Sequence, residues 1–112
     1  LDLLPDMDYG TRDSVFVPFF DIPTATITSL SRFARMARAQ VVPVVSRMTR
    51  EGYEVTVRSP WQGYPVGDVQ ADTAEMNRKL EGFIRAMPEQ YYWVHKRFKS
   101  RPPGAPSFYD GD

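Results

Sequence analysis

Apolar residues recur at helical spacing in two stretches of the chain. In the second half they form one face of a helix, made by Met76, Leu80, Phe83, Ile84 and Met87. Asp68 or Asp72 is suited to cap the amino end of this helix, and Pro88 ends it. In the first half the same spacing, starting from Thr24 as a cap, is kept by Ile27, Leu30, Phe33, Ala34 and Ala37. This periodicity predicts two amphipathic helices.

Shorter apolar runs predict strands. Residues 15–17 are β-branched and aromatic, and Pro18 restricts them to the edge or end of a sheet. Residues 41–45 have the pattern of a buried strand, and residues 1–4 fit a further one. Alternating apolar and polar residues over 53–57 follow a turn at 50–52, which predicts a β-hairpin. This order of elements predicts an α/β chain with two main helices and a right-handed parallel crossover.

The composition fits a single globular domain and excludes several classes of function. The 112 residues contain no cysteine, which excludes disulfides, a thiol nucleophile and thiolate metal sites. The single histidine, His95, cannot build a histidine-rich metal centre by itself. No apolar run approaches the roughly 20 residues that cross a bilayer. We therefore expect no metal, no cofactor and no transmembrane segment in these residues.

Charge is balanced overall but separated along the chain. Residues 1–31 carry five aspartates and one arginine, whereas residues 32–60 carry six arginines and two glutamates. The neutral net charge argues against nucleic acid as a partner, while the uneven distribution favours other anionic partners. Three arginines form a stripe on the first predicted helix, which is either solvated surface or a docking site: Arg32, Arg35 and Arg38.

An acidic loop, residues 5–10, follows the first predicted strand. It places Asp6 and Asp8 two residues apart, with Gly10 free to adopt a positive φ. Open α/β sheets place their sites at such strand ends, where a carboxylate could orient a base, contact a sugar hydroxyl or share a magnesium ion. The competing interpretation is a local turn with both aspartates solvated.

A basic, aromatic segment, residues 91–101, lies near the carboxy terminus. Its cations are Lys96, Arg97, Lys99 and Arg101. Arginine forks match phosphate oxygens, and aromatic rings suit a lipid headgroup boundary, so the segment could bind a phosphorylated or lipid substrate. A single-stranded nucleic-acid platform uses the same chemistry, and a solvated basic tail is the alternative. His95 has no visible nucleophile partner, which favours a hydrogen-bonded structural role.

These two segments carry a family resemblance. Residues 4–10, 14–20 and 87–102 look like stretches of the bacterial late acyltransferases of lipid A biosynthesis. The order of the intervening helices and strands is similar as well, so the resemblance runs from about residue 4 to residue 109. Met7 differs from the glutamine or histidine that is usual in the family, and Asp21 from a frequent glycine. Lys96 and Ser100 replace arginine and threonine.

The resemblance implies an enzyme that moves a fatty acyl chain from acyl carrier protein to a hydroxyl of a lipid A precursor. It implies a glycerolipid-acyltransferase-like fold, with a mixed sheet flanked by helices. The family's base is the histidine of a His-x4-Asp/Glu motif. The chain lacks this motif, because Ser100 stands five residues after His95. We therefore expect the carboxy-terminal half of such an enzyme, inactive alone, with the missing amino-terminal half as its partner.

The family's residues transfer to this sequence as follows. Asp6, Asp8 and Gly10 are expected to line the active site. Substrate or phosphate binding is expected of Arg12, His95, Arg97, Lys99 and Arg101. Because acyl carrier proteins are acidic, the stripe of Arg32, Arg35 and Arg38 is expected to dock the carrier.

The resemblance also implies a location and a domain organisation. The enzyme is expected at the cytoplasmic face of the inner membrane, against the membrane surface. Residues 1–109 are expected to be the carboxy-terminal part of one acyltransferase domain, with residues 102–112 as an extended Pro/Gly-rich tail. The alternative function is a stand-alone module that binds phospholipid or nucleic acid through its basic segment.

Overall fold

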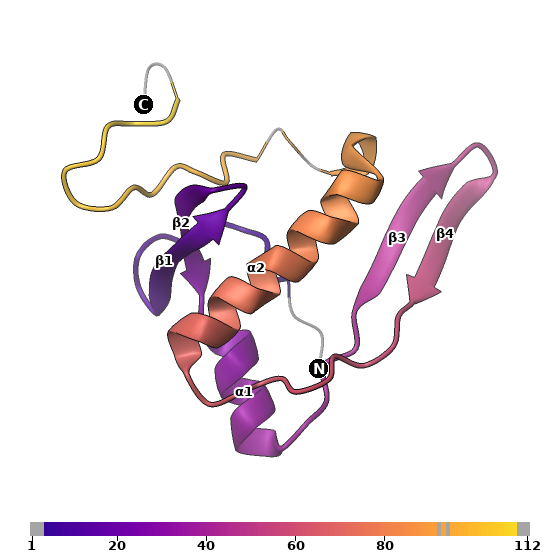
Figure 1. Ribbon diagram of the computed structural model, residues 1–112. Coiled ribbons are helices and arrows are strands. Elements are labelled where there is room, and N and C mark those ends of the chain that lie inside the picture. Colours follow the sequence, from indigo (N-terminus) through magenta and orange to yellow (C-terminus); the bar gives the residue numbers. More distant parts are fainter. Residues whose placement is uncertain (1–3, 92, 94, 110–112) are drawn as a thin grey trace.

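Two antiparallel hairpins and two helices make up the computed structural model, which describes residues 4–91, 93 and 95–109. The element order is β1 (Ser14–Phe19), β2 (Ile22–Ile27), α1 (Ser29–Ala37), β3 (Val44–Thr49), β4 (Gly52–Val57), α2 (Val69–Ala86) and the 3-10 helix η1 (Pro88–Gln90) (Figure 1). The α/β content agrees with the prediction. The predicted mixed sheet and parallel crossover are wrong for the described residues, which form two separate two-stranded antiparallel sheets. The strand predicted at residues 1–4 falls largely outside the described residues.

The strand predicted at residues 15–17 is longer than expected and forms a hairpin that the sequence did not predict. β1 continues through Pro18, which faces Pro23 of β2. The turn has two residues, which makes Pro18 and Pro23 a non-hydrogen-bonded pair of the ladder. At such a pair the backbone nitrogens point away from the partner strand, so neither proline removes a hydrogen bond between β1 and β2. The helix predicted from Thr24 is wrong at its start, because residues 24–27 belong to β2. Their β-branched side chains suit a strand, and β1 supplies the pairing partner.

Helix α1 begins where the first hairpin ends. Its N-cap is Thr28, whose backbone N–H and Oγ1 both donate to the carbonyl oxygen of Asp13, just before β1. The start of the helix is therefore held against the start of the hairpin. Arg38 ends the helix in the left-handed conformation with φ 52°.

Helix α2 confirms the clearest prediction from the sequence. Asp68 is its N-cap, with Oδ1 accepting from the N–H groups of Gln70 and Ala71. Asp72 does not cap the helix. Its carboxylate instead accepts from the N–H of Val66 at 2.8 Å and from Ser31 Oγ at 3.3 Å. Asp72 thus joins α2 to α1 and to the preceding loop.

The core lies between the β1–β2 hairpin and α2 and contains many polar groups. Its buried apolar side chains include Val17, Phe19, Ala25, Met76 and Ile84. Asn77 of α2 is fully buried and donates from Nδ2 to the carbonyl of Pro18 and to Thr26 Oγ1. Because a buried polar group is costly unless it is hydrogen-bonded, these bonds fix how the helix sits on the hairpin.

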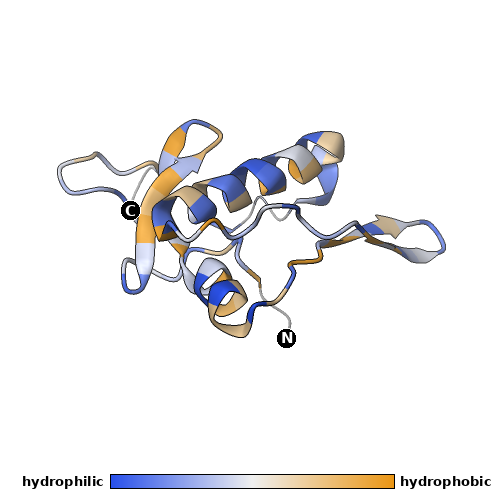
Figure 2. Ribbon diagram, turned by 60° about the horizontal axis from the view of Figure 1, so that its bottom comes forward, coloured by the Kyte–Doolittle hydropathy of each residue, from blue (hydrophilic) through white to orange (hydrophobic). Residues whose placement is uncertain are grey.

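The second hairpin confirms the predicted turn, with Arg50 and Glu51 between β3 and β4. Its first strand begins at Val44, later than the predicted residue 41. Figure 2 shows this hairpin reaching out from the rest of the molecule. The radius of gyration is 14.8 Å, against about 13 Å for a compact domain of this length.

Residues 102–109 fold back onto the basic segment instead of extending away from it. The Phe108 ring lies 4.7 Å from that of Phe98, and Tyr109 Oη accepts from the N–H of Phe98. Within the described ranges, no helix is long and apolar enough to cross a membrane.

Candidate functional site

The acidic loop and the basic segment meet at Asp8. Its Oδ1 accepts from the N–H of Gly10 at 2.8 Å and from Ser100 Oγ at 3.0 Å, while Oδ2 accepts from the N–H of Ser100 at 2.8 Å. The bond to Gly10 forms the local turn of the competing interpretation, but that interpretation is wrong in taking Asp8 as solvated: the side chain is half-buried, and its two bonds to Ser100 cross 92 residues of sequence. We call Asp8, His95 and Ser100 the Asp8 junction.

His95 forms the second half of the junction. The backbone N–H of Asp8 donates to His95 Nε2 at 3.0 Å. Asp8 therefore contacts the basic segment through both its side chain and its backbone. This contact agrees with the structural role that the sequence favours for a lone histidine.

Arg97 points into the core. It is 2% exposed, and its guanidinium donates from Nη1 to the carbonyl of Ala25 at 2.6 Å and from Nη2 to Thr26 Oγ1 at 3.0 Å. Burial lowers the pKa of Arg97, and the nearby groups of Tyr91, Asp8 and Asp6 act in the opposite direction. This geometry supports a structural role and leaves Arg97 little access to a phosphate.

Arg101 repeats this arrangement two residues back along β2. Its Nη1 donates to the carbonyl of Pro23 at 2.8 Å, and its Nε donates to the carbonyl of Pro106. Ala25 and Pro23 are the positions whose carbonyls point outward from the hairpin. Two predicted phosphate ligands thus cover the outer edge of β2. The pairing of these two arginines with a distant strand has no local signal in the sequence.

Asp6 lies beside a pocket of about 200 Å³ between α2 and β3. The pocket is mainly apolar, with walls that include Val44, Leu80, Phe83 and Met87. No hydrogen bond to the Asp6 carboxylate is found within the described residues. Asp6 is thus a carboxylate at an apolar pocket, which the sequence alone could not establish.

Tyr91 lines the same pocket and contacts the backbone of Asp6. Its Oη donates to the Asp6 carbonyl at 3.5 Å. Burial, followed by the charge of Asp6, raises the pKa of Tyr91 to about 12. Tyr91 therefore stays a neutral hydrogen-bond donor at physiological pH. Sequence reasoning placed this tyrosine in the basic segment but missed its contact with the acidic loop; its neighbours Tyr92 and Val94 lie outside the described residues.

The remaining predicted cations stay at the surface. Arg12 and Lys99 are exposed, as are Arg32 and Arg38 of α1. Arg35 is exposed as well, and its Nη1 donates to the carbonyl of Gly67. Helix α1 lies at the bottom of Figure 1, away from the basic segment at the top, so the cations of α1 and those of the basic segment form separate surfaces.

A larger apolar groove of about 680 Å³ runs between α1 and the segment that leads into β3. Its lining includes Leu30, Phe33, Ala37, Val42 and Trp61. Within the described residues, no cluster of three or more His, Asp or Glu side chains could hold a metal ion.

Comparison with known proteins yields consistent matches. The family described as "Bacterial lipid A biosynthesis acyltransferase" matches residues 2–100. The chain is 44% identical over 108 residues to the lipid A biosynthesis lauroyltransferase of Escherichia coli (strain K12). It is 39% identical over 109 residues to the palmitoleoyltransferase and 36% identical over 103 residues to the myristoyltransferase of the same organism.

These matches cover most of this chain and a minor part of each relative. The alignments span 94%, 94% and 90% of this chain, but 35%, 35% and 32% of the respective relatives. The chain therefore spans about a third of the length of the curated relatives it matches.

Proposed function

The chain belongs to the bacterial lipid A biosynthesis acyltransferase family, and on that basis we propose that it forms the carboxy-terminal part of a lipid A acyltransferase. The complete enzyme would transfer a fatty acyl chain from acyl carrier protein to a hydroxyl of a lipid A precursor. The observation that carries the proposal is the match over residues 2–100, and the meeting of the two family motifs at the Asp8 junction supports it.

The proposed reaction is acyl transfer from a thioester to an alcohol. A general base takes the proton of the acceptor hydroxyl, and its oxygen attacks the thioester carbonyl. The C–S bond then breaks, and the carrier leaves as a thiol. We assign the base to a His-x4-Asp/Glu motif in the rest of the polypeptide, because His95 already accepts a hydrogen bond at Nε2.

We assign this chain the task of shaping the acceptor side of the active site. Asp6, beside the apolar pocket, is proposed to contact the substrate, while Asp8 and Gly10 hold the loop in position. A carboxylate without a described hydrogen bond can accept one from a sugar hydroxyl. The proposed fold of the whole enzyme is glycerolipid-acyltransferase-like, with these hairpins as part of its sheet.

The exposed cations fit anionic partners. Arg12 and Lys99 are proposed to contact the phosphates of the lipid A precursor at the cytoplasmic face of the inner membrane. Arg32, Arg35 and Arg38 are proposed to dock the acidic carrier protein. Among the predicted phosphate ligands, Arg97, Arg101 and His95 are engaged inside the chain, so we assign them to positioning the basic segment.

These same contacts weigh against a stand-alone lipid- or nucleic-acid-binding module. Such a module needs its cations on the surface, and the guanidinium groups of Arg97 and Arg101 instead bind backbone carbonyls of β2.

A chimeric enzyme tests the proposed function. The matched third of the E. coli lauroyltransferase is replaced by this chain, in a strain lacking that enzyme, and lipid A is analysed by mass spectrometry. We expect the additional acyl chain to reappear. A matched control chimera, with alanine at the histidine of the His-x4-Asp/Glu motif, should be inactive. A folded, membrane-bound chimera that adds no acyl chain would contradict the proposal.

A further inference from the structure

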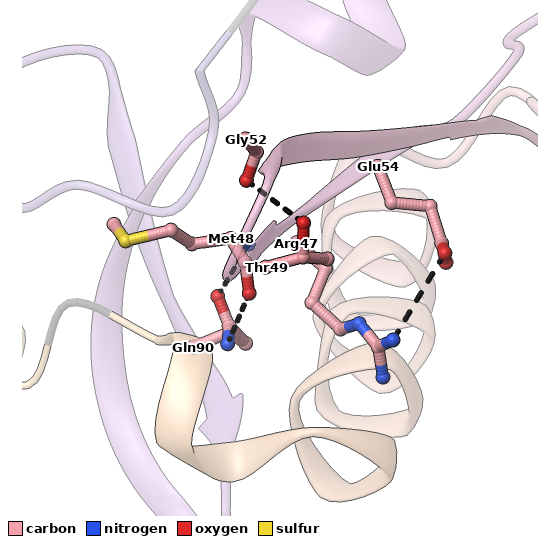
Figure 3. Close-up of polar contacts among 6 residues, drawn as sticks. All are labelled: Arg47, Met48, Thr49, Gly52, Glu54 and Gln90. Atoms are coloured by element: carbon pink, nitrogen blue, oxygen red, sulfur yellow. Dashed lines mark hydrogen bonds and ion pairs between the residues drawn. The ribbon is translucent and has the colours of Figure 1, made fainter.

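The β3–β4 hairpin presents an apolar face to solvent. The non-hydrogen-bonded pairs of its register place five large apolar side chains on one face, each at least 60% exposed: Val44, Met48, Tyr53, Val55 and Val57. The opposite face is polar apart from Val45, and on it Arg47 Nη2 lies 3.9 Å from Glu54 Oε2. Figure 3 marks this ion pair. Apolar side chains that share a face of a sheet normally pack against another layer, so this exposure marks an unfilled interface.

The outer edge of β3 is already occupied. The Gln90 carboxamide accepts from the N–H of Met48 at 2.8 Å through Oε1 and donates to the Met48 carbonyl at 3.3 Å through Nε2 (Figure 3). Gln90 thus supplies the donor and acceptor that a neighbouring strand would offer. Nearer its base, β3 lines the pocket that it shares with α2. A further strand cannot add to this edge without displacing η1.

The outer edge of β4 is open. Pairing with β3 uses the peptide groups of Gly52, Glu54 and Thr56, while those of Tyr53, Val55 and Val57 point outward. No hydrogen bond from these outward groups is found within the described ranges. An extended edge with alternating apolar residues and no proline is a template for another strand. Figure 1 shows β4 on the side of the hairpin remote from α2.

We propose that β4 pairs with an extended, apolar strand from the part of the acyltransferase polypeptide that lies outside this chain. The same part of the polypeptide would then cover the apolar face of the β3–β4 hairpin, including Val55. The curated relatives carry about two thirds of their length outside the matched region, which is ample to supply such a strand and its covering layer. The inference rests on the proposed function, because it takes the chain to be part of a longer acyltransferase.

Amide hydrogen exchange tests the pairing. The free chain is compared with the same residues in the chimeric lauroyltransferase. In the chimera, the amides of Tyr53, Val55 and Val57 should exchange about 100-fold more slowly, because they gain ladder hydrogen bonds. The amides of Glu54 and Thr56 already pair with β3 and serve as internal controls, with a smaller change.

A pair of variants separates strand addition from folding of the hairpin. Val55→Pro removes an outward N–H and leaves the β3–β4 ladder intact, whereas Val55→Thr keeps both the N–H and the β-branched shape. We expect Val55→Pro to reduce the level of folded chimera at least several-fold, and Val55→Thr to have little effect. Equal levels for the two variants would contradict strand pairing.

The remaining outcomes distinguish this inference from the proposed function. An active chimera in which the three outward amides exchange as fast as in the free chain overturns the pairing and leaves the proposed function standing. Protected amides in a folded but inactive chimera support the pairing and contradict the function. A doubled mass of the chimera, with protection of the three amides that is lost when the chimera is diluted to a monomer, assigns the edge to a second copy and overturns the inference.

Discussion

His95 Nε2 accepts a hydrogen bond from the backbone N–H of Asp8 across 87 residues of sequence. Acceptance at this atom requires that the ring hydrogen of the neutral imidazole sit on Nδ1. While the bond stands, Nε2 cannot also take a proton from a substrate hydroxyl. The only histidine of the chain therefore positions the acidic loop, and the base of the proposed reaction has to come from elsewhere in the enzyme.

The Asp8 side chain should contribute more to stability than its partner Ser100. Asp8→Ala removes the acceptor of three hydrogen bonds, and we expect it to lower the free energy of unfolding by about 2–3 kcal/mol. Ser100→Ala removes only the hydroxyl donor, at about 1 kcal/mol, and Ser100→Thr should be neutral. Urea unfolding followed by tryptophan fluorescence measures all three. Equal losses for the two alanine variants would contradict the assignment of both carboxylate oxygens.

The two arginines that bind carbonyls of β2, Arg97 and Arg101, should differ in their effect on stability. Arg97→Ala leaves the carbonyl of Ala25 without its donor and removes the buried cation near Asp6 and Asp8, and we expect a loss of about 3–5 kcal/mol in the free energy of unfolding. Arg101→Ala removes more exposed contacts and serves as the matched control, with a loss of about 1 kcal/mol. Thermal unfolding of the two variants checks this order. A larger loss for Arg101→Ala would show that Arg97 does not hold the core.

Ionisation of Tyr91 should destabilise the chain in alkaline solution. Its pKa is about 12 in the folded chain and about 10 in an unfolded one, so the neutral form is favoured by folding. The corresponding stability is fully present below pH 10 and is lost as the pH rises towards 12. Tyrosinate ultraviolet absorbance of the chain and of Tyr91→Phe gives the pKa by difference.

Tyr64 is a second half-buried tyrosine that ionises in alkaline solution, so its contribution has to be separated from that of Tyr91. Burial raises its pKa well above the ordinary value, so it also favours the neutral form in alkali. Tyr64→Phe should remove a separate part of the alkaline loss of stability. If Tyr91→Phe leaves the titration unchanged between pH 10 and 12, the burial of Tyr91 is contradicted.

Local sequence signals were sufficient for the elements that depend on their own residues. The apolar spacing from Met76 to Met87 required a helix whatever it packs on, and α2 spans Val69–Ala86. The turn before Tyr53 was equally local. At residues 24–27 the same apolar spacing was misleading, because pairing with β1 outweighs helical periodicity and lies outside any local window.

In the candidate site, too, local sequence signals identify single residues but not the contacts between distant ones. The sequence indicated that Asp6, Asp8 and His95 matter, through motifs near the two ends of the chain. It could not indicate that Asp8 binds Ser100, or that Arg97 binds a carbonyl of β2, since these contacts join residues more than 70 positions apart. Side chains that serve a distant backbone group have no periodic signature.

Asp21→Gly should stabilise the first hairpin. Phe20 and Asp21 both have positive φ, 51° and 63°, as the two-residue turn between β1 and β2 requires. Relief of left-handed strain, about 1–2 kcal/mol, exceeds the entropic cost of glycine, about 0.5–1 kcal/mol. We expect a net gain of about 0.5–1 kcal/mol in urea unfolding. Asp21→Ala is the control and should lose stability; a gain for alanine would contradict the turn geometry.

Charge reversal on α1 should weaken carrier binding. Arg32 and Arg38 are exposed, and replacing both with glutamate in the chimeric enzyme should raise the KM for acyl carrier protein about tenfold at low salt. The increase should shrink as ionic strength rises, while kcat stays unchanged. Steady-state kinetics at two salt concentrations measures it, with Arg47→Glu on the second hairpin as the control. An unchanged KM would make the stripe solvated surface.

The facing prolines of the first hairpin also determine where unassembled chains can aggregate. Pro18 and Pro23 have no N–H to offer an incoming strand, and their carbonyls are taken by Asn77 and Arg101. The second hairpin has no such protection along β4. Newly made chains should therefore associate by pairing strands through residues 52–57. The half of the molecule that carries the Asp8 junction should take no part in this association.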